Sequence, residues 1–135
     1  MFLVGRGPSL AAVGTGALVI KESDHFPAEG MSSAAFRHGP LEMLDNHNFV
    51  VVFTGERRTR KLNLKLWQNI RDRTGRTELL GDDSEFRPFR LPRVPASLRP
   101  ILEILPVQMV TLALAALDGR EAGRFTYATK VTTTE

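Results

Sequence analysis

The sequence contains no cysteine, and it has only one tryptophan and one tyrosine among its 135 residues. Without cysteine the chain forms neither a disulfide framework nor a thiolate metal site. Nucleic-acid surfaces usually interleave basic side chains with stacking aromatic rings, which are scarce here, so we expect no nucleic-acid partner. The three histidines, His25, His38 and His47, lack the spacing of metal ligands, and we expect neither a metal nor a cofactor.

Long apolar runs are also scarce. The opening run Met1–Val4 is interrupted at Arg6, which is too early for a signal peptide. No segment is expected to approach a membrane span, so we expect a cytoplasmic protein without membrane contact. A length of 135 residues with 42% apolar side chains suits one domain with a sizeable core. The net charge is +3, and the basic clusters at 57–65 and 87–99 are interpreted as solvated faces with a mild preference for anionic ligands.

Strand and helix patterns alternate along the chain, which predicts an α/β fold with a mainly parallel sheet. The expected strands are residues 2–4, 49–53, 77–80 and 86–91, and the expected long helices are residues 8–23, 59–73 and 98–117. Pro88 makes the strand at 86–91 peripheral, and Pro106 should kink or restart the last helix. That helix is apolar nearly all round, so we expect the sheet and another subunit to bury it.

One segment places a carboxylate and an imidazole at the two ends of a short connection. Glu22 is expected near the end of the first helix, and His38, sixteen residues later, should close a second and very short helix. Gly39 is expected to be the left-handed cap of that helix, and Pro40 prevents its continuation. Both groups transfer protons near neutral pH, so the pair favours acid–base chemistry. The alternative is an ordinary last-turn glutamate and a helix-capping histidine.

The order of the motifs along the chain resembles that of the sugar isomerase (SIS) domain family, in the form of the C-terminal SIS domain of the glucosamine-6-phosphate synthases. The resemblance is carried by Gly5–Pro8, Lys21-Glu22, Phe36–Pro40 and Lys130–Thr132. It implies a three-layer αβα sandwich of flavodoxin-like or Rossmann-like type, with four to five strands. It also implies that residues 1–135 are a single SIS domain equivalent to the second copy of two-domain isomerases, without the first copy or a glutaminase domain.

The resemblance further implies aldose–ketose isomerisation of a sugar or amino-sugar phosphate. Glu22 would be the proton shuttle, His38 the ring-opening acid–base group, and Lys130 an imine-forming or electrostatic group. The alternative for Lys130 is an exposed tail lysine. The expected substrate-binding residues are Gly5, Arg6, Gly7, Ser9 and Gly39. A tight strand–helix turn without a ligand is the alternative for the loop at 5–9.

Two positions depart from the synthases. Val19 stands where they have a catalytic lysine, Thr15 replaces a glutamate, and a valine cannot transfer a proton. Amidotransfer by this chain alone is therefore not expected. Three hypotheses stay open, namely a phosphosugar isomerase, a sugar-phosphate-binding or regulatory module without turnover, and a structural half-enzyme. All three predict a homodimer or pairing with another SIS domain, because the apolar last helix and one sheet face need burial.

Overall fold

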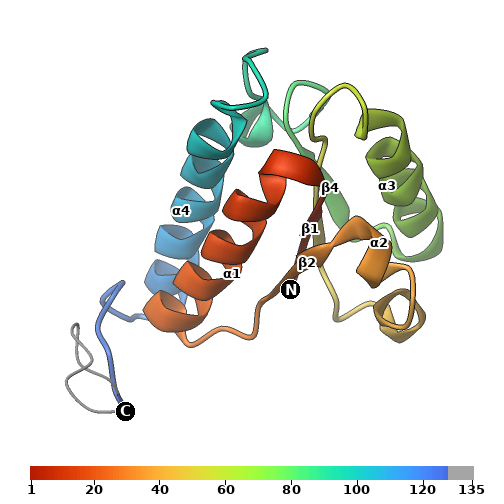
Figure 1. The fold of residues 1–135 in the computed structure, drawn as a ribbon. Helices are drawn as coiled ribbons and strands as arrows, with labels where there is room; N and C mark the ends of the chain where they lie inside the picture. The colour runs from red at the N-terminus through yellow and green to blue at the C-terminus, as the bar shows by residue number, and fades with distance from the viewer. Residues whose placement is uncertain (128–135) are drawn as a thin grey trace, which may run out of the picture.

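A parallel four-stranded sheet forms the centre of the molecule in the computed structural model, which describes residues 1–127 (Figure 1). The strands are β1 (Phe2–Gly5), β2 (Glu29–Ser32), β3 (Val50–Phe53) and β4 (Thr77–Leu80), in the spatial order β2-β1-β3-β4. All neighbouring strands run parallel. The apolar run in β3 is buried on both faces, as expected for a central strand of a parallel sheet.

Helices cover both faces of the sheet. The helices are α1 (Leu10–Asp24), α2 (Ser33–Phe36), α3 (Arg60–Thr74) and α4 (Arg99–Leu117), and the shorter 3-10 turns are η1 (Gly7–Ser9), η2 (Pro40–Met43) and η3 (Arg87–Phe89). α1 and α4 lie side by side on one face, and α2 and α3 lie on the other (Figure 1). The predicted α/β sandwich is therefore confirmed.

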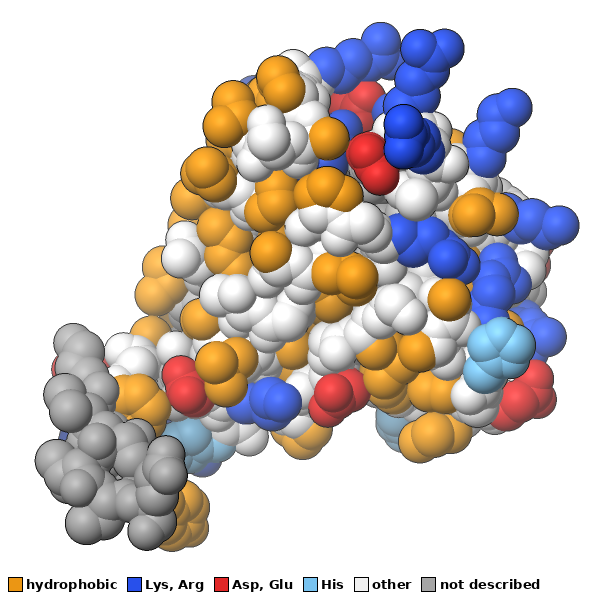
Figure 2. Space-filling view, in the orientation of Figure 1, with side chains coloured by type: hydrophobic (Ala, Val, Ile, Leu, Met, Phe, Trp, Pro, Cys, Tyr) orange, Lys and Arg blue, Asp and Glu red, His pale blue; other side chains and the backbone are white. Residues whose placement is uncertain are grey.

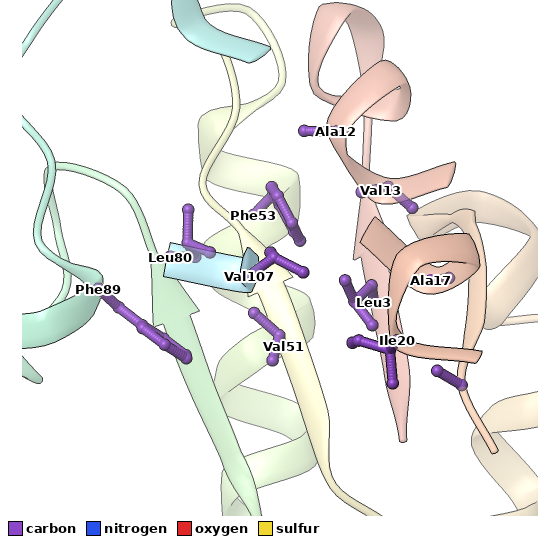
Figure 3. Packing of buried hydrophobic residues seen from close by; sticks show 11 residues of the cluster. Leu3, Ala12, Val13, Ala17, Ile20, Val51, Phe53, Leu80, Phe89 and Val107 are labelled. Carbon is purple, nitrogen blue, oxygen red and sulfur yellow. The ribbon is translucent and has the colours of Figure 1, made fainter. Parts of the chain in front are cut away.

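Alternate residues of the strands supply two separate cores, because successive side chains of a strand point to opposite faces. On one face Leu3, Val51 and Phe53 pack against α1 and Val107 of α4 (Figure 3). On the other face the core consists of Val4, Phe36, Leu41, Val50, Val52, Leu66, Ile70 and Leu79. Gly16 permits the close approach of α1 and α4, since a Cβ atom at this position would lie 2.8 Å from Cγ1 of Val107.

Two expectations about strands were wrong. β2 was not predicted, because Glu29–Ser32 has neither alternation nor β-branched residues, yet it pairs with β1 in register from Phe2–Glu29 to Gly5–Ser32. Residues 86–91 do not form a strand: they contain η3 and make one isolated bridge, between Gly81 and Arg90. Pro88 supplies no N–H for a ladder, and the tight turn instead places Phe89 in the core.

The short connection after β2 also differs in detail from its prediction. α2 ends at Phe36, so His38 lies in the turn that follows the helix instead of closing it. Gly39 has a φ of 120° and a ψ of −70°, which lies outside the left-handed helical region, so it does not form the expected cap. Its positive φ still explains a glycine at this position.

α4 bears on two expectations. It continues as one helix through Pro106, so the helix does not restart there, and the alternative of a kink at Pro106 stays a prediction. It is also the one helix within residues 1–127 that is long and apolar enough to cross a membrane by length and composition, with a mean hydropathy of 1.8, so the expectation that no segment approaches a span was wrong. Core helices share these properties, and in this fold α4 packs along α1 with Glu103 buried on its inner side.

Candidate functional site

The connections after β1 and β3 diverge at the centre of the sheet, which creates a crevice at its carboxyl edge. β1 is followed by α1 on one face, whereas the neighbouring β3 is followed by α3 on the other. Ligands of open α/β sheets bind at such a switch point. The two loops that border the crevice touch, because a Cβ atom on Gly7, whose φ is +60°, would lie 3.0 Å from Oε1 of Glu56.

A buried network of charged and hydroxyl groups connects this crevice to α4. The Ser9 hydroxyl donates to Oε1 of Glu103 at 2.9 Å, and Nη1 of Arg99 lies 3.6 Å from the same oxygen. The exposed fractions of Glu103 and Arg99 are 0% and 7%. Burial raises the pKa of Glu103, although the Ser9 hydrogen bond and the charge of Arg99 oppose that shift. Arg99 also donates to Oγ1 of Thr54, at the end of β3, at 3.3 Å.

Asp82 follows directly after β4 and Gly81 and is the acidic centre of a cluster of arginines. Its carboxylate accepts hydrogen bonds from Arg60 at 2.7 Å, Arg93 at 3.1 Å and Arg99 at 3.4 Å. Burial alone would raise the pKa of Asp82, but the hydrogen bonds and charges of the arginines outweigh burial and lower it. Arg60 pairs with Asp83 as well. Asp82 therefore stays ionised and holds three arginines from separate parts of the chain at one place.

A groove with a volume of about 720 Å³ opens beside this cluster. Five arginines and two carboxylates contribute to its wall, and its lining residues are Glu56, Arg57, Arg58, Arg60, Asp82, Arg93, Val94, Ala96 and Arg99. Figure 2 shows Lys and Arg side chains gathered at the top and right of the view, over the loops at the carboxyl edge and over α3. The groove therefore presents more positive than negative charge to a ligand.

Asn63 connects the loops that follow β2 and β3. The hydroxyl of Ser33 donates to Oδ1 of Asn63 at 3.0 Å, and Nδ2 of Asn63 donates to the carbonyl of Thr54 at 3.2 Å. All three residues are buried. Since the first turn of α3 carries Asn63, the position of that helix is fixed relative to two strand ends.

The predicted substrate loop is packed tightly into this edge. A Cβ atom on Gly5 would lie 3.1 Å from Cγ2 of Val13, so close packing against α1 favours glycine there irrespective of a ligand. Ser9 is fully buried and its hydroxyl is committed to Glu103. Arg6 is half-buried, and its Nε atom has no hydrogen-bond partner among residues 1–127. A role of these residues in substrate binding stays a prediction.

The predicted catalytic residues lie apart from the groove. Glu22 is exposed in the last turn of α1, next to Lys21, whose Nζ atom lies 4.0 Å from Glu29 at the start of β2. His38 and Gly39 are exposed in the turn after α2. No hydrogen bond or ion pair joins Glu22 to His38 within the part of the chain that the structure describes. Lys130 lies outside the described residues, so these assignments stay predictions.

Sequence reasoning did not identify the buried network as part of a site. The arginines of the groove were interpreted as solvated faces with a mild preference for anionic ligands, and Asp82 and Glu103 were not singled out. One signal was available, because Arg99, Glu103 and Val107 recur every four residues and therefore share one side of the last helix. A charge on the buried side of an apolar helix indicates a partnered polar site. No group of three or more potential metal ligands exists within residues 1–127.

Comparison with known proteins finds relatives that cover most of this chain. No family model matches the sequence. The glutamine–fructose-6-phosphate aminotransferase (isomerizing) of Pyrococcus horikoshii is 34% identical over 128 residues, which cover 91% of this chain and 21% of the relative. The enzyme of the same name from Thermococcus kodakarensis is 31% identical over 128 residues, covering 89% of this chain and 21% of that protein.

Solved structures agree on the fold. The C-terminal domain of the glucosamine-fructose-6-phosphate aminotransferase from Francisella tularensis superposes with a TM-score of 0.77 and 23% identity, over 87% of this chain and 35% of that one. Glucosamine-6-phosphate deaminase from Thermotoga maritima superposes with a TM-score of 0.81 and 16% identity, over 96% of this chain and 39% of that one.

The chain therefore has the α/β fold of the phosphosugar isomerase (SIS) domains. The resemblance predicted from the sequence is confirmed, and the chain is similar to part of the isomerizing glutamine–fructose-6-phosphate aminotransferases. It spans about a fifth of the length of those relatives.

Proposed function

We propose that this chain is a single SIS domain that binds a sugar phosphate and takes part in the aldose–ketose isomerisation of a sugar or amino-sugar phosphate. The observation that carries the proposal is the 34% identity, across nine-tenths of the chain, to an aminotransferase whose name includes isomerisation. In this proposal residues 1–135 correspond to the second SIS copy of a two-domain isomerase. The chain spans 21% of that relative, and the proposal concerns this part alone.

In the proposed reaction His38 opens the sugar ring by moving a proton between the anomeric hydroxyl and the ring oxygen. The Glu22 carboxylate then removes a proton from the hydroxyl-bearing carbon next to the carbonyl group, which leaves an enediolate, and returns it to the former carbonyl carbon. The proton of the neighbouring hydroxyl passes to the former carbonyl oxygen, so that the carbonyl group moves by one carbon. Both side chains are exposed and thus accessible to a substrate. Lys130 would form an imine with the open-chain ketose or stabilise the enediolate by its charge.

Pairing with a second SIS domain is part of the proposal. Glu22 lies on α1 and His38 follows α2, and these helices cover opposite faces of the sheet (Figure 1). A partner domain, either a second copy of this chain or another SIS domain, would bring the missing group to each site. α4 offers a surface for that partner, because Ile101, Leu105, Met109 and Leu112 form an exposed apolar stripe at helical spacing.

The replacement Glu22→Gln tests the isomerase assignment. Turnover of fructose, glucose and glucosamine 6-phosphates is measured with the chain alone and with a candidate partner SIS domain. The variant should lose about 10²–10⁴-fold in turnover, because an amide cannot accept the proton. Its melting temperature should not change, because Glu22 is exposed. Glu42→Gln, on another exposed carboxylate, is the matched control, and full activity of Glu22→Gln would contradict the assignment.

A sugar-phosphate-binding module without turnover is the second candidate. Val19, half-buried on α1, stands in place of the catalytic lysine of the synthases and supports this alternative. A thermal-shift titration with the same sugar phosphates separates the two functions, because a ligand that binds the folded state raises the melting temperature whether or not it reacts. Stabilisation without turnover, alone and with the partner, would favour the binding module.

A further inference from the structure

We propose that the arginine-lined groove at the carboxyl edge binds phosphoryl groups. This groove lies beyond the loop at 5–9 from which the sequence predicts substrate binding, and none of its five arginines is in that loop. The inference rests on the proposed function only for the identity of the sugar, because the charge and geometry of the groove are independent of the reaction.

The charge distribution in the groove supports an anion. Glu56 and Asp82 are the acidic residues of its lining, and Asp82 is already committed to three arginines. Arg57 and Arg58 are exposed, and neither makes a hydrogen bond or ion pair to another side chain within residues 1–127. Their guanidinium groups can therefore turn toward a ligand, and guanidinium matches phosphate in bidentate geometry.

Arg99 supplies a second and independent observation. Its exposed fraction is 7%, and it lines the groove. Its Nη atoms contact Thr54, Asp82 and Glu103. Its Nε atom has no hydrogen-bond partner among residues 1–127. That atom is itself buried, so Arg99 favours an anion through its fixed positive charge in the wall of the groove.

Two helix starts add to the positive potential of the groove. α3 begins at Arg60 and α4 at Arg99, and both residues line it. Neither helix has a side-chain hydrogen bond at its N-cap, Thr59 or Leu98. Pro100 has no N–H, and the N–H groups of Arg60 and Arg99 donate to the carbonyls of Glu56 and Ala96, so the helix starts favour an anion here through their dipoles.

The size of the groove indicates a ligand larger than a single inorganic phosphate. A volume of about 720 Å³ is within the range of small-molecule sites. Pyrophosphate should therefore bind more tightly than inorganic phosphate, by about tenfold or more, because the second phosphoryl group gains further charge-assisted hydrogen bonds. Binding should weaken as the salt concentration rises.

The test is isothermal titration calorimetry of the full chain with inorganic phosphate, pyrophosphate, fructose 6-phosphate and fructose at low ionic strength. The double variant Arg57→Gln/Arg58→Gln should lose at least about tenfold in affinity for pyrophosphate. Arg76→Gln/Arg87→Gln is the matched control, since it removes the same charge from exposed arginines outside the groove. The folding of both variants is checked by their melting temperatures.

The sugar phosphate distinguishes two sources of the phosphoryl group. If fructose 6-phosphate competes with pyrophosphate, and the groove variant weakens both, the groove holds the phosphate of the sugar. If pyrophosphate binds without competition, the groove takes a separate phosphorylated ligand. The absence of pyrophosphate binding, or equal losses in the groove and control variants, would overturn the proposal. The isomerase assignment is judged separately, by the turnover of Glu22→Gln.

Discussion

The hydrogen bond between Ser9 and Glu103 can be tested by a double-mutant cycle. It joins residues 94 positions apart, at the start of α1 and inside α4, and both side chains are fully buried. Ser9→Ala removes the donor and leaves the carboxylate less well satisfied, which should lower the free energy of unfolding by about 1.5–3 kcal/mol. Glu103→Ala also removes the partner of Arg99, and should lower it by about 3–5 kcal/mol.

The interaction energy follows from the non-additivity of the two changes. Once Glu103 is alanine, Ser9 has no acceptor to lose. The free energy lost by the double variant should therefore be smaller than the sum of the two single losses by about 1.5–3 kcal/mol. Urea denaturation gives each free energy of unfolding. Unfolding is monitored by circular dichroism and by the fluorescence of Trp67, the only tryptophan.

Thr111 provides the control for this cycle. It is buried on α4 two turns beyond Glu103, and its hydroxyl donates to the carbonyl of Val107 at 2.9 Å. Ser9→Ala combined with Thr111→Val should therefore be additive within about 0.5 kcal/mol. Additivity of the Ser9 and Glu103 changes to the same tolerance would refute the argument that this buried hydrogen bond couples α1 to α4.

Two further predictions concern α4. Burial raises the pKa of Glu103 from about 4.5, so the folded state binds a proton more tightly than the unfolded state. The free energy of unfolding of the wild type, relative to that of Glu103→Gln, should therefore fall as the pH rises from about 4.5 through the raised pKa. Urea titrations across this pH range check the sign, and an increase in relative stability with pH would mean that Arg99 outweighs burial. The double variant Leu105→Asp/Met109→Asp should convert the paired form of the chain to a monomer, as measured by light scattering. Lys61→Asp/Lys65→Asp on α3 is the control. A wild type that is monomeric both alone and with a partner SIS domain would contradict pairing through the α4 stripe.

The sequence predicts the fold where one local signal dominates. β3 is recognisable because Val50–Phe53 is a continuous apolar run, and α3 is recognisable from its amphipathic spacing and from Gly75 at its end. β2 has no such signal, and its position depends on contacts with other elements. A Cβ atom on Gly30 would lie 2.6 Å from the carbonyl oxygen of Val13, so this strand needs a glycine where α1 crosses it.

The candidate site was less predictable because tertiary contacts assemble it. Arg60, Arg93 and Arg99 reach Asp82 from separate parts of the chain, and no short motif contains all four. In the sequence, basic clusters of this kind cannot be distinguished from solvated surface. By contrast, the motif around Glu22 and His38 was found by resemblance, and the structure adds that its two halves belong to opposite faces of the sheet.

The two sides of α4 have a thermodynamic consequence. One side carries the exposed stripe of Ile101, Leu105, Met109 and Leu112, while the helix start places Arg99 in the groove. An anion in the groove beside Arg99 and a domain that covers the stripe would therefore both act on α4. Linkage requires the effect to be mutual. If the anion changes the affinity between the domains by some factor, association of the domains changes the affinity for the anion by the same factor.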